Sequence, residues 1–251
     1  MIRNELIYVL GEKQFDVKKV GNRGKLVRLI QEWLCLNNLP VVIDGIYGPA
    51  TERAVVEFQK VNGLSDDGWV SYNTFGKLTA PMRRVFRKIQ IDDTINKLGA
   101  TTLAYARLHL KQHPREVGGQ NRGPWVRLYM LGNEGKRYPW CAGFVSFHVR
   151  QASQALEIEN PLKYCFSVGM LAFYARRAKQ FLSHKSHCLP GPGYIFLQKS
   201  KRGYSHCGIV NVVENEYFTS IEGNTNDSGS AEGYEVCARI RSYKNKDFVI
   251  I

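Results

Sequence analysis

The chain has 251 residues, of which 44% are hydrophobic and 12% aromatic, so it can form one large or two small packed domains. Its formal charge of +13 at pH 7 suits an anionic partner, but no helix-turn-helix, RNA-recognition or zinc-finger pattern points to nucleic acid. No run approaches the roughly 18 apolar residues of a membrane span, and six cysteines without a CxxC pair indicate reduced thiols rather than a disulfide framework.

The start of the chain, MIRNELIYVLGEKQFD, lacks the features of a secretion signal. Its short apolar run is broken by Gly11 and Glu12, and no small-residue cleavage site follows. We therefore expect synthesis in the cytoplasm without a signal peptide, and action elsewhere only after export or release by lysis.

Residues 25–78 have the pattern of three short helices joined by tight turns. The apolar positions at helical spacing are Leu26, Leu29, Ile30, Trp33 and Leu34 in the first helix, Ala54, Val55, Phe58 and Val61 in the second, and Phe75 and Leu78 in the third. Pro49 fits the first turn of the second helix, and Gly63 fits its left-handed C-terminal cap. Asp-Gly pairs at 44–45 and 67–68 supply the turns.

This pattern resembles the peptidoglycan-binding domain found beside cell-wall hydrolases. The matching residues are Asp44, Gly45, Tyr47, Gly48, Thr51, Ala54, Val55, Phe58, Gln59, Gly63, Leu64, Asp67, Gly68 and Thr74. The chain departs from the family where Trp69-Val70-Ser71 replaces a small, glycine-containing turn and where Phe75 replaces a tryptophan. The resemblance implies peptidoglycan as partner, with Asp44, Tyr47 and Trp69 as candidate glycan contacts. Without it, the same residues only build a three-helix fold.

Residues 81–99 place four cations around apolar positions, which is the pattern of a basic amphipathic helix. The cations are Arg83, Arg84, Arg87 and Lys88. We expect a linker helix between two domains. Its charge could contact an anionic wall polymer, but a solvated face is the commoner role of such a run. Residues 1–80 are nearly neutral, so the positive excess lies on this segment and on the rest of the chain.

Residues suited to nucleophilic catalysis follow one another in the second half. Cys141 begins an apolar run of helical period, so its sulfur is predicted at a helix N-terminus, where free N–H groups favour the thiolate. His206 stands at the start of an apolar strand, while Glu222 and Asn224 flank Gly223 and can share one face of the next strand. A thiol needs a base nearby, and the base needs a third group to fix its tautomer.

These motifs resemble the CHAP domain, the cysteine, histidine-dependent amidohydrolase/peptidase family. They are Tyr138-Pro139-Trp140-Cys141-Ala142, the strand at 193–196, Ser205-His206-Cys207-Gly208-Ile209-Val210, Glu222-Gly223-Asn224 and a glycine-rich turn at 116–123. The resemblance covers roughly residues 93 to 251. It implies a papain-like fold with Cys141 as nucleophile and His206 as general base. Glu222 would be the orienting carboxylate and Asn224 a supporting amide.

Several neighbouring residues have two interpretations. Asp227 is a second candidate for the orienting group, unless residues 224–227 are only a loop. Gln120 or Asn121 is a candidate donor to the oxyanion, and Trp140 a candidate substrate contact, or these polar residues simply shape the turn. Cys207 is expected to pack on the opposite face of its strand from His206.

The proposed chemistry requires no metal and no cofactor. His184, His187 and Cys188 are the only cluster with a metal-like composition, and they lack the fourth ligand that a closed zinc site needs. We therefore predict no metal site.

The sequence thus predicts an α+β protein. Residues 1–80 would form a small three-helix domain, 81–99 a basic linker helix, and 100–251 a papain-like catalytic domain with an antiparallel sheet. The expected function is hydrolysis of an amide bond in peptidoglycan, either the muramoyl–L-alanine amide or a peptide bond of the stem or cross-bridge. The protein would act in the periplasm or cell wall of a target cell.

Two delivery routes and two other function classes stay open. The protein could be a phage endolysin or a secreted antibacterial effector, and only an effector would need an immunity protein as partner. It could also be a wall-binding protein without catalysis, or a cysteine protease or deamidase that acts on a protein substrate.

Overall fold

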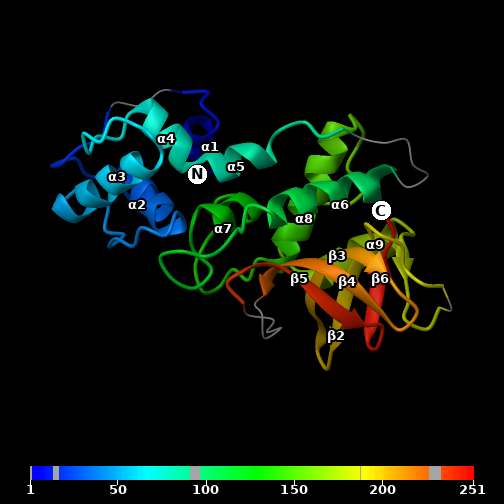
Figure 1. The fold of residues 1–251 in the computed structure, drawn as a ribbon. Coiled ribbons are helices and arrows are strands. Elements are labelled where there is room, and N and C mark those ends of the chain that lie inside the picture. The colour runs from blue at the N-terminus through cyan, green and yellow to red at the C-terminus, as the bar shows by residue number, and fades with distance from the viewer. Residues whose placement is uncertain (1, 14–16, 91–96, 187, 226–232) are drawn as a thin grey trace.

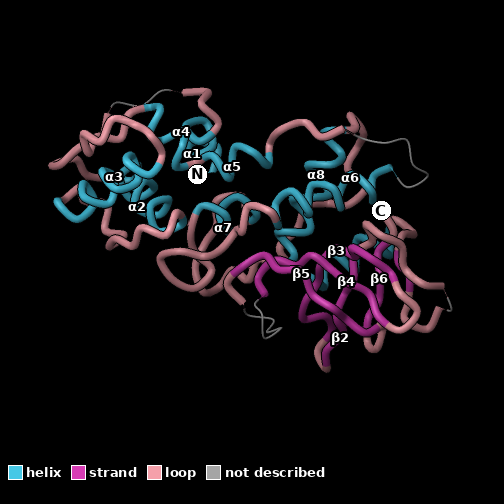
Figure 2. The backbone as a smooth tube through the Cα atoms, viewed as in Figure 1, coloured by secondary structure: helices cyan, strands magenta, loops and turns pink. Residues whose placement is uncertain are grey.

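The computed structural model describes residues 2–13, 17–90, 97–186, 188–225 and 233–251. Within these ranges the chain forms nine helices followed by one six-stranded sheet, so the predicted α+β class is confirmed (Figure 1). Figure 2 shows the strands gathered at one end of the molecule, with a purely helical region at the other. None of the helices in the described ranges is both long and apolar enough to cross a bilayer.

The element boundaries follow the sequence order. The helices are α1 (Ile2–Val9), α2 (Lys25–Leu36), α3 (Pro49–Val61), α4 (Tyr72–Leu78), α5 (Ala80–Val85), α6 (Lys97–Leu110), α7 (Pro124–Tyr129), α8 (Cys141–Ala155) and α9 (Val168–Arg177). The strands are β1 (Phe181–Leu182), β2 (Ile195–Ser200), β3 (Gly203–Val213), β4 (Tyr217–Thr225), β5 (Glu235–Ser242) and β6 (Lys246–Val249).

The three predicted N-terminal helices are present as α2, α3 and α4. Pro49 occupies the first turn of α3, and Gly63 follows that helix with φ 63°, a left-handed conformation that favours glycine. Ser71 caps α4, because its side-chain oxygen accepts a hydrogen bond from the Thr74 N–H. The apolar faces of the three helices meet around Trp33, which is buried.

The basic segment after α4 differs from its prediction. A single linker helix over residues 81–99 is wrong, because α5 ends at Val85 and a turn follows; residues 91–96 lie outside the described ranges. The side-chain amide of Gln151, from α8, donates a hydrogen bond of 2.6 Å to the Val85 carbonyl. That bond takes the place of the next helical turn. Met82 and Val85 are buried, so the apolar side of this segment packs against the protein.

The sheet places two central strands beside helix α8. Its strands run antiparallel in the order β1-β6-β2-β3-β4-β5. Helix α8 packs on β3 and β4, which brings the start of that helix to the strands that carry His206 and Glu222. The opposite face of the sheet has a separate apolar cluster of four buried side chains. They are Phe196, Val210, Phe218 and Phe248.

The helical end and the sheet end share one hydrophobic core. The buried side chains of the main cluster run without interruption from α1 to the C-terminal strand. At the junction, Trp33 of α2 meets Trp125 of α7 edge-on, with ring centroids 6.0 Å apart. The two halves therefore pack directly against each other rather than being separated by a solvated spacer.

Candidate active site

The candidate nucleophile is the first residue of α8, as predicted. Trp140 is the N-cap residue of this helix and makes no side-chain capping bond, so the positive end of the helix dipole lies beside Cys141. The pKa of the Cys141 thiol lies well below its usual range. Cys207 lowers it most through a hydrogen bond, His206 and the Ala142 N–H add to the effect, and burial opposes it. The position thus favours a thiolate.

His206 lies on β3, between the thiol and a carboxylate. Its Nε2 is 2.7 Å from Oε2 of Glu222, and both side chains are buried. Its other ring nitrogen, Nδ1, makes no hydrogen bond of regular geometry within the described residues. Burial lowers the pKa of His206, but the interactions with Cys141 and Glu222 outweigh it and raise the pKa to about 9. An imidazolium beside a thiolate is the arrangement that activates a cysteine nucleophile.

Glu222 on β4 is held by two residues that the sequence analysis missed. Ser220 Oγ donates to its Oε1 at 2.5 Å. Arg241 of β5 binds both oxygens, with Nε 2.8 Å from Oε1 and Nη2 2.6 Å from Oε2. Burial raises the pKa of Glu222, but Arg241 and His206 outweigh it and lower the pKa to about 2. Glu222 therefore stays charged and can stabilise an imidazolium.

The sequence pattern could indicate Ser220 as a neighbour of Glu222, but not Arg241. Ser220 and Glu222 are two positions apart on one strand, and so share a face. Arg241 lies diagonally across the β4–β5 ladder, where Phe218 pairs with Arg241 and Glu222 pairs with Cys237. Only the register of this ladder shows that the arginine reaches the carboxylate.

Asn224 departs from the simple alternation on which its prediction rested. The register of β4 with β5 shifts between Glu222 and Thr225, and Asn224 has φ 58°. Its carbonyl accepts a hydrogen bond of 3.2 Å from the Gly233 N–H. The residue is buried, and its role as a supporting amide stays a prediction. Asp227, the alternative orienting group, lies outside the described residues.

A glycine-rich turn is fixed beside the nucleophile. Glu116 accepts hydrogen bonds from the Asn121 N–H at 2.7 Å and from the Trp140 indole N–H at 2.9 Å. Asn121 is buried, and its side-chain amide is 3.3 Å from the Lys136 carbonyl, so it shapes the turn. Gln120 is exposed and stays a candidate oxyanion donor. We call residues 116–123 the active-site turn.

Trp140 is a packing residue, which corrects its assignment as a substrate contact. Its ring is buried and stacks on Tyr129, with centroids 5.5 Å apart. A Cβ at Gly223, on β4, would lie 2.6 Å from this ring, so a glycine is needed there. Trp140 thus links three parts of the chain. Its indole N–H donates to Glu116 of the active-site turn, its backbone caps α8, and its ring lies against Gly223 of β4.

The remaining cysteine and histidine candidates take structural positions. Cys207 is fully buried in the main core, as expected for the face opposite His206, and in addition contacts Cys141. Burial, followed by the neighbouring Cys141, raises the pKa of the Cys207 thiol well above its usual range. His184 Nδ1 lies 2.8 Å from Asp247 Oδ1, and His187 lies outside the described residues.

In the N-terminal helices, the two Asp-Gly turns are held by one repeated set of hydrogen bonds. Gln31 donates to Asp44 Oδ1 at 2.8 Å and accepts from the Gly45 N–H at 2.8 Å. Gln59 does the same in the second turn. It donates to Asp67 Oδ1 at 3.0 Å and accepts from the Gly68 N–H at 3.0 Å. Both glutamines are buried, so each turn is built around an amide from the preceding helix.

Of the three candidate glycan contacts, Asp44 and Trp69 are exposed and Tyr47 is not. Tyr47 is fully buried and donates its hydroxyl to the Gly68 carbonyl at 2.8 Å, so it is a core residue, not a contact. Asp44 accepts from Gln31 and, at 2.8 Å, from the Ile46 N–H, and these bonds lower its pKa. Trp69 is 45% exposed, with Lys19 Nζ 4.6 Å from its ring centroid.

The comparison with known families agrees with this geometry. Residues 23–78 match the family model of the putative peptidoglycan binding domain. No curated protein matches the chain. We therefore call residues 23–78 the peptidoglycan-binding module. The match supports association with the cell wall and supports peptidoglycan as a partner of this chain.

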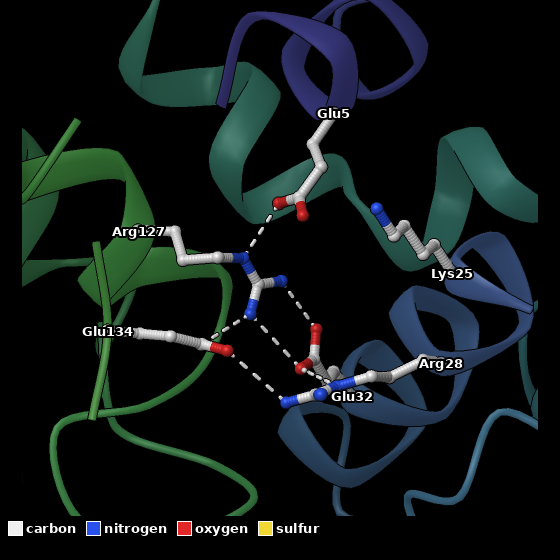
Figure 3. Close-up of a pocket in the computed structure, with 6 residues that line it drawn as sticks. All are labelled: Glu5, Lys25, Arg28, Glu32, Arg127 and Glu134. Atoms are coloured by element: carbon white, nitrogen blue, oxygen red, sulfur yellow. Dashed lines mark hydrogen bonds and ion pairs between the residues drawn. The ribbon is translucent and has the colours of Figure 1, made fainter. Parts of the chain in front are cut away.

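A charged cavity separates the peptidoglycan-binding module from the active-site turn. It measures about 100 Å³, and Figure 3 shows the six side chains that line it. They are Glu5, Lys25, Arg28, Glu32, Arg127 and Glu134. Arg127, from α7, is buried at the centre, and its guanidinium contacts carboxylates from both sides of the junction (Figure 3).

Proposed function

We propose that the protein is a peptidoglycan hydrolase that cleaves an amide bond of the cell-wall peptide with a Cys-His-Glu site. The observation that carries the proposal is the buried chain of contacts from Cys141 through His206 to Glu222. It lies in the same compact structure as a peptidoglycan-binding module. The module supplies the substrate class, and the chain of contacts supplies the chemistry.

The first half of the reaction forms an acyl-enzyme. The Cys141 thiolate attacks the carbonyl carbon of the amide, and a C–S bond forms as the carbonyl oxygen takes negative charge. The N–H groups at the start of α8 can stabilise that charge. The His206 imidazolium then gives its proton to the departing amine, and the C–N bond breaks.

The second half releases the product. Neutral His206 takes a proton from water, and the hydroxide attacks the thioester carbon. The C–S bond breaks, a carboxylic acid leaves and the Cys141 thiolate returns. Glu222 stays ionised throughout, because Ser220 and Arg241 hold both of its oxygens. It fixes the ring of His206 and stabilises each imidazolium that forms.

The proposal includes two kinds of cleaved bond and two routes by which the protein reaches the wall. The cleaved bond is the muramoyl–L-alanine amide or a peptide bond of the stem or cross-bridge. The protein acts in the wall of a target cell, as a phage endolysin or as a secreted effector; an effector would have an immunity protein in the producing cell.

The test is digestion of purified peptidoglycan, with products identified by mass spectrometry. We expect the wild type to release stem peptides free of muramic acid if it is an amidase, or shortened or uncrosslinked muropeptides if it is an endopeptidase. Cys141→Ala should release neither. Cys188→Ala is the matched control, because that cysteine is exposed and lies outside the proposed site.

The same experiment separates the other function classes. Identical undigested profiles for wild type and Cys141→Ala, with wall binding retained, would leave a wall-binding protein without catalysis. Processing of a protein substrate by wild type but not by Cys141→Ala, with peptidoglycan untouched, would instead identify a cysteine protease or deamidase.

A further inference from the structure

The active-site turn is anchored by two carboxylates. Glu116 accepts the Asn121 N–H at 2.7 Å, and Glu134 accepts the Gly123 N–H at 3.1 Å. Gly123 has φ 111°, and a Cβ there would lie 2.8 Å from Val117, so the chain can pass this point only as glycine. One acceptor, Glu116, belongs to the turn itself, and the other, Glu134, lies outside it, so the shape of the turn depends in part on an external group.

The second of these anchors is itself held from across the junction. Arg127 Nη1 lies 2.7 Å from Glu134 Oε2, while its Nη2 lies 2.6 Å from Oε2 of Glu32. Glu32 belongs to α2 of the peptidoglycan-binding module and is fully buried. Its side chain points directly at the guanidinium in Figure 3. Two further side chains complete the network. Glu5 Oε2 lies 2.8 Å from Arg127 Nε, and Arg28 Nη2 lies 3.3 Å from Glu134 Oε1.

We propose that Glu32 of the peptidoglycan-binding module is a positioning residue for the active site, acting through Arg127 and Glu134 on the active-site turn. The module would then be part of the catalytic unit as well as a wall anchor. The inference rests on the proposed function, because it concerns the geometry of that reaction.

The path from the turn to the nucleophile is short. Asn121 and the Trp140 indole share the carboxylate of Glu116, and Trp140 directly precedes Cys141. A displacement of the turn is therefore passed through Glu116 and Trp140 to the residue directly before Cys141. Misplacement by about 1 Å can slow an enzyme by roughly 100-fold without changing its reacting groups.

The charge balance explains why Glu32 is the critical member on the module side. Burial lowers the pKa of Arg127, but Glu32, followed by Glu5 and Glu134, raises it overall. When Glu32 is neutral, the Arg127 guanidinium loses its closest carboxylate. Only Glu5 and Glu134 then remain as its carboxylate partners, so its contacts with them rearrange. Glu134 then moves from the position in which it accepts the Gly123 N–H.

The test compares Glu32→Gln with Glu57→Gln in the full chain. Both changes remove one carboxylate from the same module, but Glu57 is exposed on α3 and its side chain takes part in no hydrogen bond or ion pair within the described residues. With soluble muropeptides as substrate, we expect Glu32→Gln to lower kcat about 10- to 100-fold with little change in KM. Alkylation of Cys141 by iodoacetamide should stay near the wild-type rate, since its activating contacts are untouched.

Hydrogen exchange gives a second readout that needs no activity. The amides of Asn121 and Gly123 should exchange about 10-fold faster in Glu32→Gln than in Glu57→Gln, because their acceptors become less fixed. If Glu32→Gln does not fold, Glu134→Gln replaces it, since that side chain is only partly buried. In Glu134→Gln, hydrogen exchange should rise more at the Gly123 amide than at the Asn121 amide, because Glu134 accepts only the former.

The outcomes separate the two proposals. A wild type that leaves muropeptides intact contradicts the proposed function, while exchange at the turn still tests the coupling. Wild-type kcat and unchanged exchange in Glu32→Gln would overturn the inference and leave the hydrolase proposal standing. Equal loss of turnover and of iodoacetamide reactivity would also overturn it, because that result indicates general damage to the fold.

Discussion

Two buried networks in this protein pair an arginine with carboxylates, and they differ in what they leave open. At the candidate active site, Arg241 holds Glu222, and Glu222 holds one nitrogen of His206. The other nitrogen, Nδ1, has no hydrogen bond of regular geometry within the described residues, and the ring also interacts with Cys141. At the junction, Nε, Nη1 and Nη2 of Arg127 all contact carboxylates. The first network ends at His206, a side chain that can exchange a proton. In the second network, all three guanidinium nitrogens of Arg127 are bound to carboxylates.

The difference shows how the same type of interaction can serve catalysis or architecture. A carboxylate fixed by arginine stays ionised, and its pKa of about 2 at Glu222 keeps it available to a histidine. At Arg127 the guanidinium is bound by carboxylates from three separate parts of the chain and no histidine among the described residues lines the cavity, so this network holds elements together.

The largest effect should come from removing the group that makes the first network reactive. His206→Ala takes away the proposed base, so turnover should fall by about 10⁵-fold, as for loss of the histidine in other nucleophile–base pairs. Release of muropeptides from purified peptidoglycan measures this loss. Binding to the same material should be unchanged, and a parallel loss of binding would contradict the separation of the two roles.

The next effect tests the closed network through stability. Arg127→Met removes the buried counter-charge of Glu32 and Glu134 and leaves them only the more exposed Arg28, so the free energy of unfolding should fall by about 3–5 kcal/mol. Urea unfolding followed by circular dichroism measures it. Arg127→Met/Glu32→Met should recover at least half of the loss, because the buried charge goes with its partner. A double variant no more stable than the single one would refute this account.

A smaller effect on activity is expected at Arg241. Arg241→Gln removes both hydrogen bonds from Glu222, so the pKa of that carboxyl should rise and its hold on His206 should weaken. Turnover at pH 7 should fall by about 10- to 100-fold, and the acid limb of the pH profile should move to higher pH. Arg239→Gln on the same strand is the control, and equal effects in both would show a role of general charge instead.

The pH dependence of stability should distinguish the two networks further. The pKa of His206 is raised from 6.5 to about 9, so its contribution is complete below pH 6.5 and lost as pH rises through about 9. The pKa of Glu222 is lowered from 4.5 to about 2, so its contribution is complete above pH 4.5 and lost as pH falls through about 2. The stability advantage of wild type over His206→Ala should therefore be greatest between these limits, near pH 5 to 6. A flat difference across urea titrations from pH 3 to 10 would contradict the assignment.

The smallest effect concerns wall binding by the module itself. Trp69→Ala removes an exposed aromatic surface, so affinity for purified sacculi should fall by about 10-fold, or roughly 1.4 kcal/mol. Trp69→Phe keeps an aromatic ring and should retain most of it. Co-sedimentation of the Cys141→Ala protein gives the measurement without digestion. Equal binding by all three would place the contact elsewhere on the module.

Local patterns in the sequence predicted much of this arrangement. Helical spacing located α2 and α3, and the run after Pro139 located the start of α8 at Cys141. These features depend on residues within one or two turns of each other. The same reasoning failed for residues 81–99, where a distant amide, that of Gln151, ends α5 at Val85.

At the candidate site, the sequence supplied the reacting residues but not their supports. Arg241 and Ser220 escaped because strand register, not spacing, brings them to Glu222. Tyr47 and Trp140 were read as contacts because burial cannot be inferred from residue type for amphipathic aromatic side chains.

The sequence by itself determined the short-range features, which are the helices, the two Asp-Gly turns and the placement of a cysteine before an apolar helical run. Each depends on backbone preference and periodicity among neighbouring residues. Only the tertiary structure decided that Glu32 lies against Arg127, 95 residues away in the chain, and that Arg241 lies against Glu222. Such pairs form when packing excludes water and leaves each buried charge to find a partner, and no local pattern records which partner that is.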